Sequence, residues 1–515
     1  MTGPAGEASR GSAGRRSAGI LLHPSSLPGP FGIGDVGPAA LRFLDWAAAA
    51  GQSFWQILPL CPTGAGDSPY GGTSAFAGNP LLISPEALAA EGWLAPSELA
   101  GAPAGVGEAV DFAAAAAWKE RILRAAWVRF REAAGSEARG ALERFSGAPA
   151  QAFWLSDWTL FAAARRARGG ASWTEWEAGL GQRQPASLAQ ARRDLAQEIA
   201  FEEFVQFLFF RQWERLRREA DLRGIEILGD IPIYIAHDSA DVWAHGRLFA
   251  LDSAGRPESV AGVPPDYFSA TGQLWGYPVY RWEESARDGH AWWIERLRAN
   301  LRIADAARID HFRGFAAFWE VAASEETALR GRWSPGPGRS LFDAARRAIG
   351  KLPLVAEDLG IITPDVEELL AELAIPGMKV LQFAFSEDDS PHLPHRHVEN
   401  SLVYTATHDN DTTRGWAAGL SAEERRRFLA YAGGDASDPA ADLIRMAYES
   451  VAARAVVPIQ DVFDLGSEAR MNTPGRAAGN WSWRARAEDF SPERAARLRR
   501  LAELTGRRET EDGRL

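Results

Sequence analysis

Short runs of apolar residues recur along the chain, and longer amphipathic segments separate them. Eight such runs predict strands, with the fourth lying inside the stretch 307–315: 20–23, 54–58, 225–230, 307–315, 352–358, 378–383, 401–409 and 455–460. Between them, apolar residues at helical spacing predict helices, for example over 39–50 and 291–300. No two-residue hairpin turn joins consecutive strands. This alternation predicts an α/β fold, a parallel (β/α)8 TIM barrel.

Two segments are too long to be simple connections between strands. Residues 84–218 are rich in Ala, Arg and Glu, so we expect a large, mainly helical insertion after the second strand. Residues 231–282 carry many aromatic side chains and predict a long loop subdomain after the third strand. We expect residues 1–18 to form a disordered tail and residues 506–515 to fray, which leaves 19–505 as one barrel domain.

Composition narrows the classes of function. A net charge of −12 over 515 residues argues against nucleic-acid binding, which depends on neutralising phosphates. No apolar run approaches the length needed to cross a membrane, so no membrane partner is expected. The single cysteine, Cys61, allows no intrachain disulfide and fits a reducing, cytoplasmic compartment. The 20 Trp residues suit either a packed core or the apolar faces of sugar rings.

Polar residues gather where the predicted strands end. They are His23, Gln56, Asp230, Asp310, Glu357, Gln382, Asp409 and Gln460. In a barrel these ends meet at one mouth. The three carboxylates Asp310, Glu357 and Asp409 would allow a double displacement with a nucleophile, a proton donor and a group that orients the substrate. Such retaining glycoside chemistry requires the first two carboxyl groups to stand roughly 5 to 5.5 Å apart.

The neighbours of two carboxylates suggest different roles for them. Arg308 lies two positions before Asp310, on the same face of a strand, and should lower the pKa of that carboxyl group. Glu357 follows apolar residues and has no adjacent cation, so its pKa should rise enough for it to act as an acid. Asp310 is therefore the candidate nucleophile and Glu357 the candidate proton donor. His311 and His408 would donate hydrogen bonds to sugar hydroxyls.

Other interpretations of these residues remain open at this point. Arg308 and Asp310 could be a structural ion pair, and acids after strands, such as Asp230 and Asp358, could cap helices. The His-Asp pairs beginning at 237 and 408, and the Asp-His pair at 310, could suggest a metal site, but the chain has no HExxH motif. It also lacks a phosphate-binding GxxxxGK[ST] loop. We therefore expect neither a metal nor a cofactor.

Several motifs together resemble one known family. RIDH at 308–311, AEDLG at 356–360 and THDNDT at 407–412 are similar to conserved regions of the α-amylase clan. The flanking motifs resemble the amylomaltases, the 4-α-glucanotransferases of glycoside hydrolase family 77: HPSSLPGP at 23–30, GDSPY at 66–70, GVPPDYF at 262–268, GMKVLQF at 377–383 and ARMN at 469–472. The resemblance spans about 19–504. It implies a TIM barrel without the C-terminal β-sandwich of ordinary α-amylases.

The resemblance also implies roles for individual residues. Asp310 would form the covalent glucosyl-enzyme, Glu357 would be the general acid/base, and Asp409 would bind ring hydroxyls and help to distort the sugar. The expected sugar-binding residues are Tyr70, Ser68, Asp67, Trp275, Arg308, His311, His408 and Asn472. The loop 263–268 would overhang the cleft. Ala65 stands where relatives can carry an aromatic residue, so a remote glucan contact would be missing.

The activity implied by the resemblance is transfer between α-1,4-glucans. Maltooligosaccharides would serve as donor and acceptor, and glucose would also serve as an acceptor. Two alternatives remain: a retaining α-glucan hydrolase and a glucan-binding protein without catalytic activity.

Overall fold

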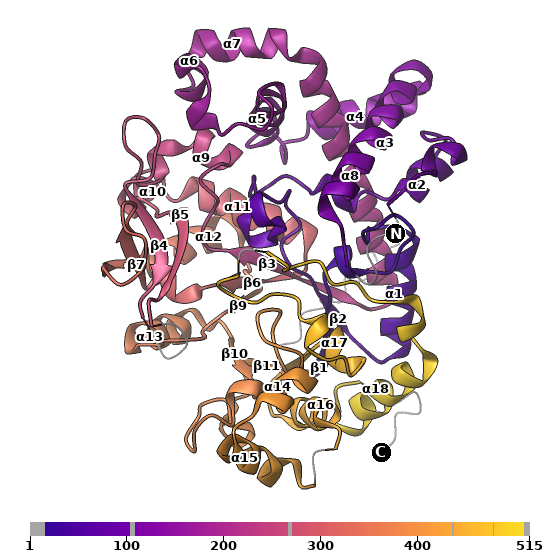
Figure 1. The fold of residues 1–515 in the computed structure, drawn as a ribbon. Coiled ribbons are helices and arrows are strands. Elements are labelled where there is room, and N and C mark those ends of the chain that lie inside the picture. Colours follow the sequence, from indigo (N-terminus) through magenta and orange to yellow (C-terminus); the bar gives the residue numbers. More distant parts are fainter. Residues whose placement is uncertain (1–15, 104–108, 266–269, 435–436, 477, 509–515) are drawn as a thin grey trace, which may run out of the picture.

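The computed structural model describes residues 16–103, 109–265, 270–434, 437–476 and 478–508, and its largest sheet is a barrel of eight parallel strands. The strands are β1 (Ser17–Leu21), β2 (Phe54–Gln56), β3 (Glu226–Pro232), β6 (Ala306–Asp310), β9 (Leu354–Ala356), β10 (Gly377–Val380), β11 (Ser401–Tyr404) and β12 (Arg454–Pro458). They pair in the order β10-β11-β12-β1-β2-β3-β6-β9. The Ala356 N–H donates to the Pro376 carbonyl at 2.9 Å, which joins the two ends of the sheet (Figure 1).

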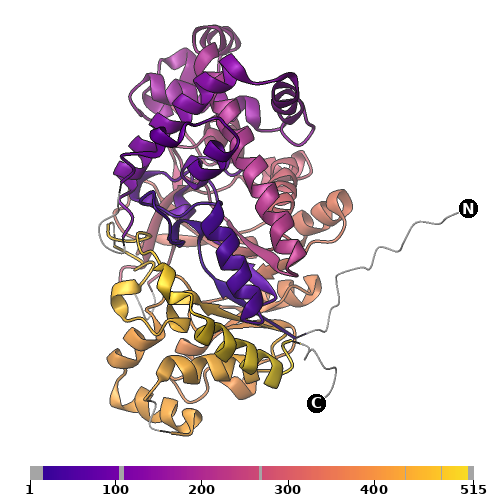
Figure 2. The same ribbon diagram turned by 90° about the vertical axis from the view of Figure 1, so that its right-hand side faces the viewer.

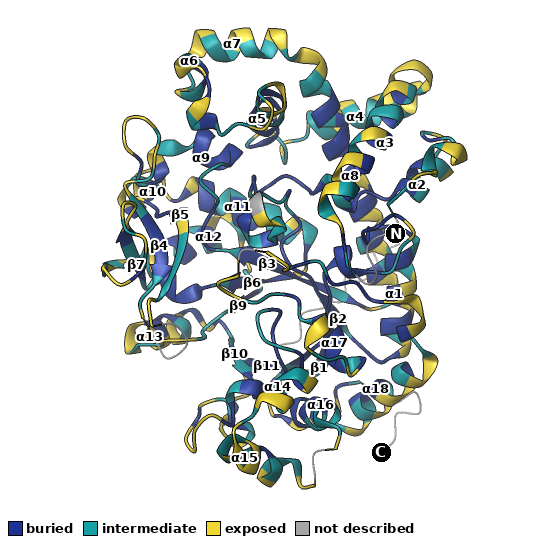
Figure 3. Ribbon diagram, in the orientation of Figure 1, coloured by how far each residue is buried: buried dark blue, intermediate teal, exposed yellow. Residues whose placement is uncertain are grey.

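Burial on both faces explains the sequence pattern of these strands. Four of the five residues of β1 and four of the five residues of β6 are buried. Strands that are covered on both sides appear as continuous apolar runs rather than as alternating ones. Figure 3 shows the barrel strands as buried and the surrounding helices as exposed on their outer sides. All eight predicted strands exist, and the predicted fold class is confirmed.

Amphipathic helices cover the outside of the barrel. In α1 (Pro38–Ala49), Pro38 occupies the first turn, where its missing N–H costs no hydrogen bond, and Ala40, Phe43, Leu44 and Ala47 form the buried stripe. The other helices outside the insertion are α9 (Ala240–Ala244), α10 (Trp282–Arg287), α11 (Ala291–Ile303), α12 (Arg339–Ile349), α13 (Pro364–Leu373), α14 (Thr413–Gly419), α15 (Ala422–Ala432), α16 (Pro439–Glu449), α17 (Ile459–Val462) and α18 (Pro492–Leu504).

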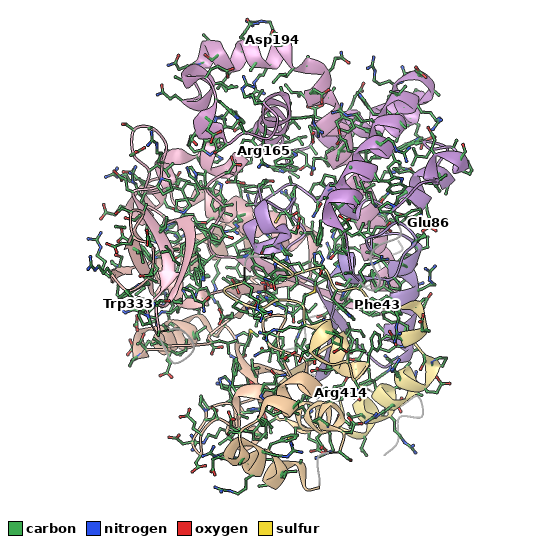
Figure 4. All side chains as sticks on the ribbon, in the orientation of Figure 1. Phe43, Glu86, Arg165, Asp194, Trp333 and Arg414 are labelled. Carbon is green, nitrogen blue, oxygen red and sulfur yellow. The ribbon has the colours of Figure 1, made fainter. Side chains whose placement is uncertain are left out.

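The chain between β2 and β3 is mainly helical. Its helices are α2 (Pro85–Ala90), α3 (Phe112–Ala133), α4 (Ser136–Ser146), α5 (Leu155–Ala167), α6 (Ala178–Gly181), α7 (Pro185–Asp194) and α8 (Ala196–Leu222). They extend the molecule beyond one side of the barrel, as the two views in Figures 1 and 2 show. Figure 4 marks Asp194 at the outer end of this region. The long helix α8 returns the chain to β3.

A second sheet lies beside the barrel, and the sequence pattern did not predict it. Its four antiparallel strands are β4 (Ser259–Val263), β5 (Gln273–Pro278), β7 (Ala317–Ala322) and β8 (Gly331–Pro335), in the order β5-β4-β7-β8. Two strands come from the segment after β3 and two from the segment after β6. The segment 231–282 is therefore not simply a long loop. Trp319 and Trp333 face each other across β7 and β8, with Trp333 at the sheet edge (Figure 4).

The expected tail boundaries were wrong where the structure describes them. Ser17 and Ala18 already pair with β12, and Ala18 is fully buried. Arg507, expected to fray, is 1% exposed and donates hydrogen bonds to six backbone carbonyls, which fixes the segment just after α18 on the barrel. The described residues do not include 1–15 and 509–515 of the predicted tails, nor 266–268 of the predicted overhanging loop. The side chain of Ala65 is not described either.

The part of the chain after β12 that is described contains helices and no strand that could build a β-sandwich. Among the described helices, none is both long and apolar enough to span a bilayer.

Candidate active site

The predicted acids lie at the carboxyl ends of three barrel strands, of which β6 and β9 are neighbours and β11 is separated from β9 by β10. Asp310 ends β6, Glu357 follows β9 directly, and Asp409 lies in the loop after β11. The parallel register places Arg308 level with Asp230 on β3 and with Val355 on β9. The mouth of the barrel therefore brings together residues that are more than 150 positions apart in sequence, as a barrel should.

Arg308 forms ion pairs with two carboxylates at the mouth, Asp230 and Asp310. Its guanidinium donates from Nη1 to Asp230 Oδ2 and from Nη2 to Asp310 Oδ1, both at 2.6 Å, and the arginine is 3% exposed. The hydroxyl of Tyr70 donates to the same Asp230 oxygen at 2.6 Å. Asp230 is therefore an ion-pair partner inside the site. The sequence left open a helix-capping role for Asp230 and gave no reason to rank it with the three acids.

Burial changes the electrostatics that the sequence suggested. Desolvation raises the pKa of Asp310 to about 6, and the negative charges of Asp230 and Asp409 add to this effect, while Arg308 opposes it. The expectation that Arg308 would lower this pKa overall was wrong, because a neighbouring cation was the only effect visible in the sequence. The Asp310 side chain is still 28% exposed, so it can reach a bound ligand.

Glu357 holds its proton more tightly than Asp310 does. Burial and the charge of Asp310 together raise the pKa of Glu357 to about 8, against the opposing effects of Arg308 and two backbone hydrogen bonds. These bonds come from the N–H groups of His311 and Leu359, each at 2.7 Å, and they fix the carboxyl group in place. The sequence analysis predicted a raised pKa for Glu357, and the structure gives the same direction. The order of these two pKa values favours an ionised Asp310 beside a protonated Glu357.

His311 adopts a backbone conformation that is unusual for a residue other than glycine. Its φ of 52° and ψ of 51° are left-handed, which typically costs about 1 to 3 kcal/mol. This turn directs the His311 N–H to Glu357. The ring packs edge-on against Trp275, with centroids 4.7 Å apart, and burial lowers its pKa to about 3. Its Nε2 is buried and has no hydrogen-bond partner among the described residues.

Asp409 is held from the opposite side of the mouth. Asn472 Nδ2 donates to Asp409 Oδ1 at 2.6 Å, and Arg470 Nη2 donates to the Asp409 carbonyl at 2.7 Å. His408 Nε2 lies 3.5 Å from the other carboxylate oxygen. The predicted residues Asn472 and His408 are thus both in contact with Asp409.

An aromatic wall borders this side of the site. The rings of Tyr70 and His408 stack at 5.0 Å with an interplanar angle of 16°, and Trp481 contacts both at 5.7 and 5.8 Å. Trp481 was missed by the sequence analysis. Its φ is 64°, a left-handed value that no sequence motif signals.

Ser68 and Asp67 have local roles in the loop after β2. The Ser68 hydroxyl accepts a hydrogen bond from the Tyr70 N–H at 3.2 Å, which positions the tyrosine. Asp67 precedes it with a φ of 58°. Within the described residues neither side chain hydrogen-bonds to the three acids. His23, His408 and Gln460, from three other strand ends, line a small cavity of about 30 Å³ at the same mouth.

These features define a class: a (β/α)8-barrel enzyme whose paired carboxyl groups have the unequal proton affinities that glycosidic-bond chemistry requires. The model of glycoside hydrolase family 77, described as 4-alpha-glucanotransferase, matches residues 22–489. The chain belongs to this family and is an enzyme of the 4-α-glucanotransferase type.

Individual relatives agree over almost the whole chain. The 4-alpha-glucanotransferase of Thermus thermophilus is 48% identical over 501 residues, which cover 96% of this chain and 99% of that protein. That of Synechocystis is 48% identical, covering 96% and 98%. The structure of amylomaltase from Streptococcus agalactiae in complex with acarbose superposes with a TM-score of 0.93 at 36% identity, covering 96% of this chain and 100% of that one.

Proposed function

We propose that Asp310 is the nucleophile and Glu357 the general acid/base of a disproportionation between α-1,4-glucans. The observation that carries these roles is the unequal set of partners: Arg308 donates to Asp310 at 2.6 Å, whereas backbone N–H groups donate to Glu357, and burial raises the pKa of Glu357 to about 8 and that of Asp310 to about 6. Arg308 touches Asp310 and stabilises its anion. Within the part of the chain that the structure describes, Glu357 receives hydrogen bonds only from neutral backbone groups, so it keeps its proton to a higher pH.

In the first step, Asp310 attacks the anomeric carbon of the donor glucan. The glycosidic bond breaks, and Glu357 gives its proton to the departing 4-oxygen, so the released sugar leaves with an intact hydroxyl. In the second step, the 4-hydroxyl of an acceptor glucan or glucose attacks the same carbon and gives its proton to Glu357. Asp310 leaves as a carboxylate, and the configuration at the anomeric carbon is retained.

The remaining residues would hold the sugar during both steps. Asp409, fixed by Asn472, would accept hydrogen bonds from ring hydroxyls, and neutral His311 would meet another hydroxyl through its free Nε2. Tyr70 and His408 would form the wall against which the ring packs. Trp275 would contact the sugar beyond the cleaved bond, and Ser68 and Asp67 would shape the loop that carries Tyr70. We also propose a cytoplasmic location, since a single cysteine suits a reducing compartment.

Incubation with maltotriose alone tests this proposal. If maltotriose serves as donor and acceptor, chromatography will show glucose together with maltooligosaccharides longer than the starting material. Glucose and maltose without longer products would instead support the retaining hydrolase. Asp310→Ala should abolish turnover while maltotriose binding persists; a turnover unchanged by this substitution would show that another residue is the nucleophile.

A further inference from the structure

Trp481 has a backbone conformation that a bulky residue rarely adopts. Its φ of 64° lies in the left-handed region, which is energetically costly for any residue other than glycine. Its side chain is 5% exposed, so this strain does not belong to a loose surface loop. Strained residues persist where the surrounding structure holds them, and they gather at active sites. Trp481 takes part in neither of the proposed chemical steps, so its strained position at the mouth needs another explanation.

The indole ring of Trp481 packs against the two rings of the aromatic wall. Its centroid lies 5.7 Å from that of Tyr70 and 5.8 Å from that of His408. Tyr70 and His408 also stack on each other at 5.0 Å, so each of the three rings contacts the other two. Because Trp481 is itself almost inaccessible, it offers little surface to a sugar. Any effect of Trp481 on the reaction must therefore pass through its neighbours.

The contact with Tyr70 leads toward the proposed nucleophile. The Tyr70 hydroxyl donates to Asp230 Oδ2 at 2.6 Å. Arg308 donates to the same oxygen and, from its other Nη atom, to Asp310. A rotation of the Tyr70 ring would break its hydrogen bond to Asp230 and remove one of the groups that fix this ion-pair chain. Trp481 lies beside the tyrosine ring and restricts that rotation.

The contact with His408 leads to the third acid. His408 Nε2 lies 3.5 Å from Asp409 Oδ2. The backbone of Trp481 reaches the same acid by another path, because its N–H donates to the Met471 carbonyl at 2.7 Å. The residue after Met471 is Asn472, whose Nδ2 donates to Asp409 Oδ1 at 2.6 Å. Trp481 therefore contacts residues that hold acids on both sides of the mouth.

We propose that Trp481 is a positioning residue for the transfer reaction. Its indole ring fixes the rings of Tyr70 and His408. These two residues in turn hold the groups that orient Asp310 and Asp409, and the inference rests on the roles proposed for these two acids. A displacement of reacting groups by about 1 Å can cost about 10²-fold in rate. Loss of the ring contacts should therefore slow the chemical steps more than it weakens substrate binding, because the buried indole is not part of the sugar-binding surface.

Steady-state kinetics with maltotriose test this role. Trp481→Leu should lower kcat about tenfold or more and change KM by less than about threefold. Trp481→Phe keeps an aromatic ring and should retain kcat within about threefold of the unsubstituted enzyme. Trp46→Leu is the matched control, since Trp46 is a buried tryptophan on α1 that packs against Phe43, Phe463 and Phe490. Its kcat and KM should be unchanged even if its melting temperature falls.

A double variant tests whether Trp481 acts through the tyrosine. In a Tyr70→Leu background, the added substitution Trp481→Leu should lower kcat by a smaller factor than it does alone, because the contact between the two rings has already been lost. Factors that multiply fully would show that the two residues act independently, and would overturn the proposal.

Other results would also contradict the role of Trp481. These are an unchanged kcat in folded Trp481→Leu, an equal loss in Trp481→Phe, a loss that appears in KM rather than in kcat, and a loss of kcat in Trp46→Leu as large as that in Trp481→Leu. Failure of the proposed catalytic roles gives a different result, because Asp310→Ala would then keep its turnover. If Trp481→Leu does not fold, as judged by its melting curve, Trp481→Met takes its place in the same assays, since methionine adapts to irregular space.

Discussion

Asp230→Asn is the substitution that most directly tests the electrostatics of the site. Tyr70 and Arg308 both donate to Asp230 Oδ2, while Oδ1 has no partner among the described residues. An asparagine with its carbonyl oxygen in the position of Oδ2 keeps both hydrogen bonds and places its amide at the position of Oδ1. The substitution therefore removes one negative charge from the site and changes its shape very little.

The size of the effect follows from the shared guanidinium. Asp230 and Asp310 each lie 2.6 Å from a different Nη atom of Arg308, so their carboxyl groups are roughly 6 Å apart. At an effective dielectric constant of about 20, two unit charges at that distance repel by about 3 kcal/mol, equivalent to about two powers of ten in a proton equilibrium. The Asp230 charge raises the pKa of Asp310, so its removal lowers that pKa.

The dependence of kcat/KM on pH, measured as glucose release from maltotriose, reports this change. The unsubstituted enzyme should give a bell-shaped profile, because Asp310 must be ionised and Glu357 protonated; burial puts their pKa values at about 6 and about 8. In Asp230→Asn, the acidic limb should move down by about 1 to 2 pH units. The basic limb should move less, because desolvation and the charge of Asp310 are the largest causes of the raised pKa of Glu357.

Asp343→Asn provides the matched control, since it removes a carboxylate that pairs with Arg339 on α12, away from the mouth. Its pH profile should equal that of the unsubstituted enzyme. An acidic limb that stays in place or moves upward in Asp230→Asn, with the melting temperature unchanged, would refute the assigned charge coupling between Asp230 and Asp310.

Three further substitutions test other contacts. Glu357→Gln should lower kcat with maltotriose by a factor of about 10² to 10⁴. The variant should still form the glucosyl-enzyme from α-glucosyl fluoride, because fluoride leaves without help from an acid. Mass spectrometry of the intact protein detects this adduct, and its absence would contradict the role of Glu357 as an acid. Asn472→Ala frees Asp409 and should lower kcat/KM about tenfold or more in the same assay, whereas an unchanged value would exclude the positioning role. Arg507→Ala removes donors to six carbonyls and should lower the free energy of unfolding by about 3 kcal/mol or more in urea titrations. Arg500 is exposed, so Arg500→Ala should lower the free energy of unfolding by less than about 0.5 kcal/mol.

The barrel was predictable because its strands, apart from β10 with its alternating burial, are short apolar runs that are largely buried on both faces. The second sheet was not, since β4 contains Gly262 and pairs with β7, more than 50 residues further along the chain. No local pattern specifies such a pairing. The predicted strands were also too long: β11 ends at Tyr404, and the residues up to Asp409 belong to the loop that carries the site.

Some residues of the site could likewise be predicted from the sequence, and others could not. Asp310, Glu357 and Asp409 were visible because each lies at the end of a predicted strand, and His311 and His408 flank two of them. Trp481 was not, because its contacts with Tyr70 and His408 join segments that are far apart in sequence. The net pKa of Asp310 was predicted with the wrong sign, because the cost of burial appears only when the fold is known.

The role of Arg308 therefore differs from the one that the local sequence suggested. A lone arginine beside Asp310 would lower its pKa, but the guanidinium is shared with Asp230, and burial raises the pKa of Asp310 and of Glu357 alike. Arg308 instead contributes to the difference between the pKa of Asp310 and the pKa of Glu357. It donates directly to Asp310, whereas the described residues give Glu357 hydrogen bonds from backbone N–H groups alone, so Glu357 retains its proton to a higher pH. Because the proposed chemistry needs one anion and one acid at the same pH, this difference matters more than either pKa value by itself.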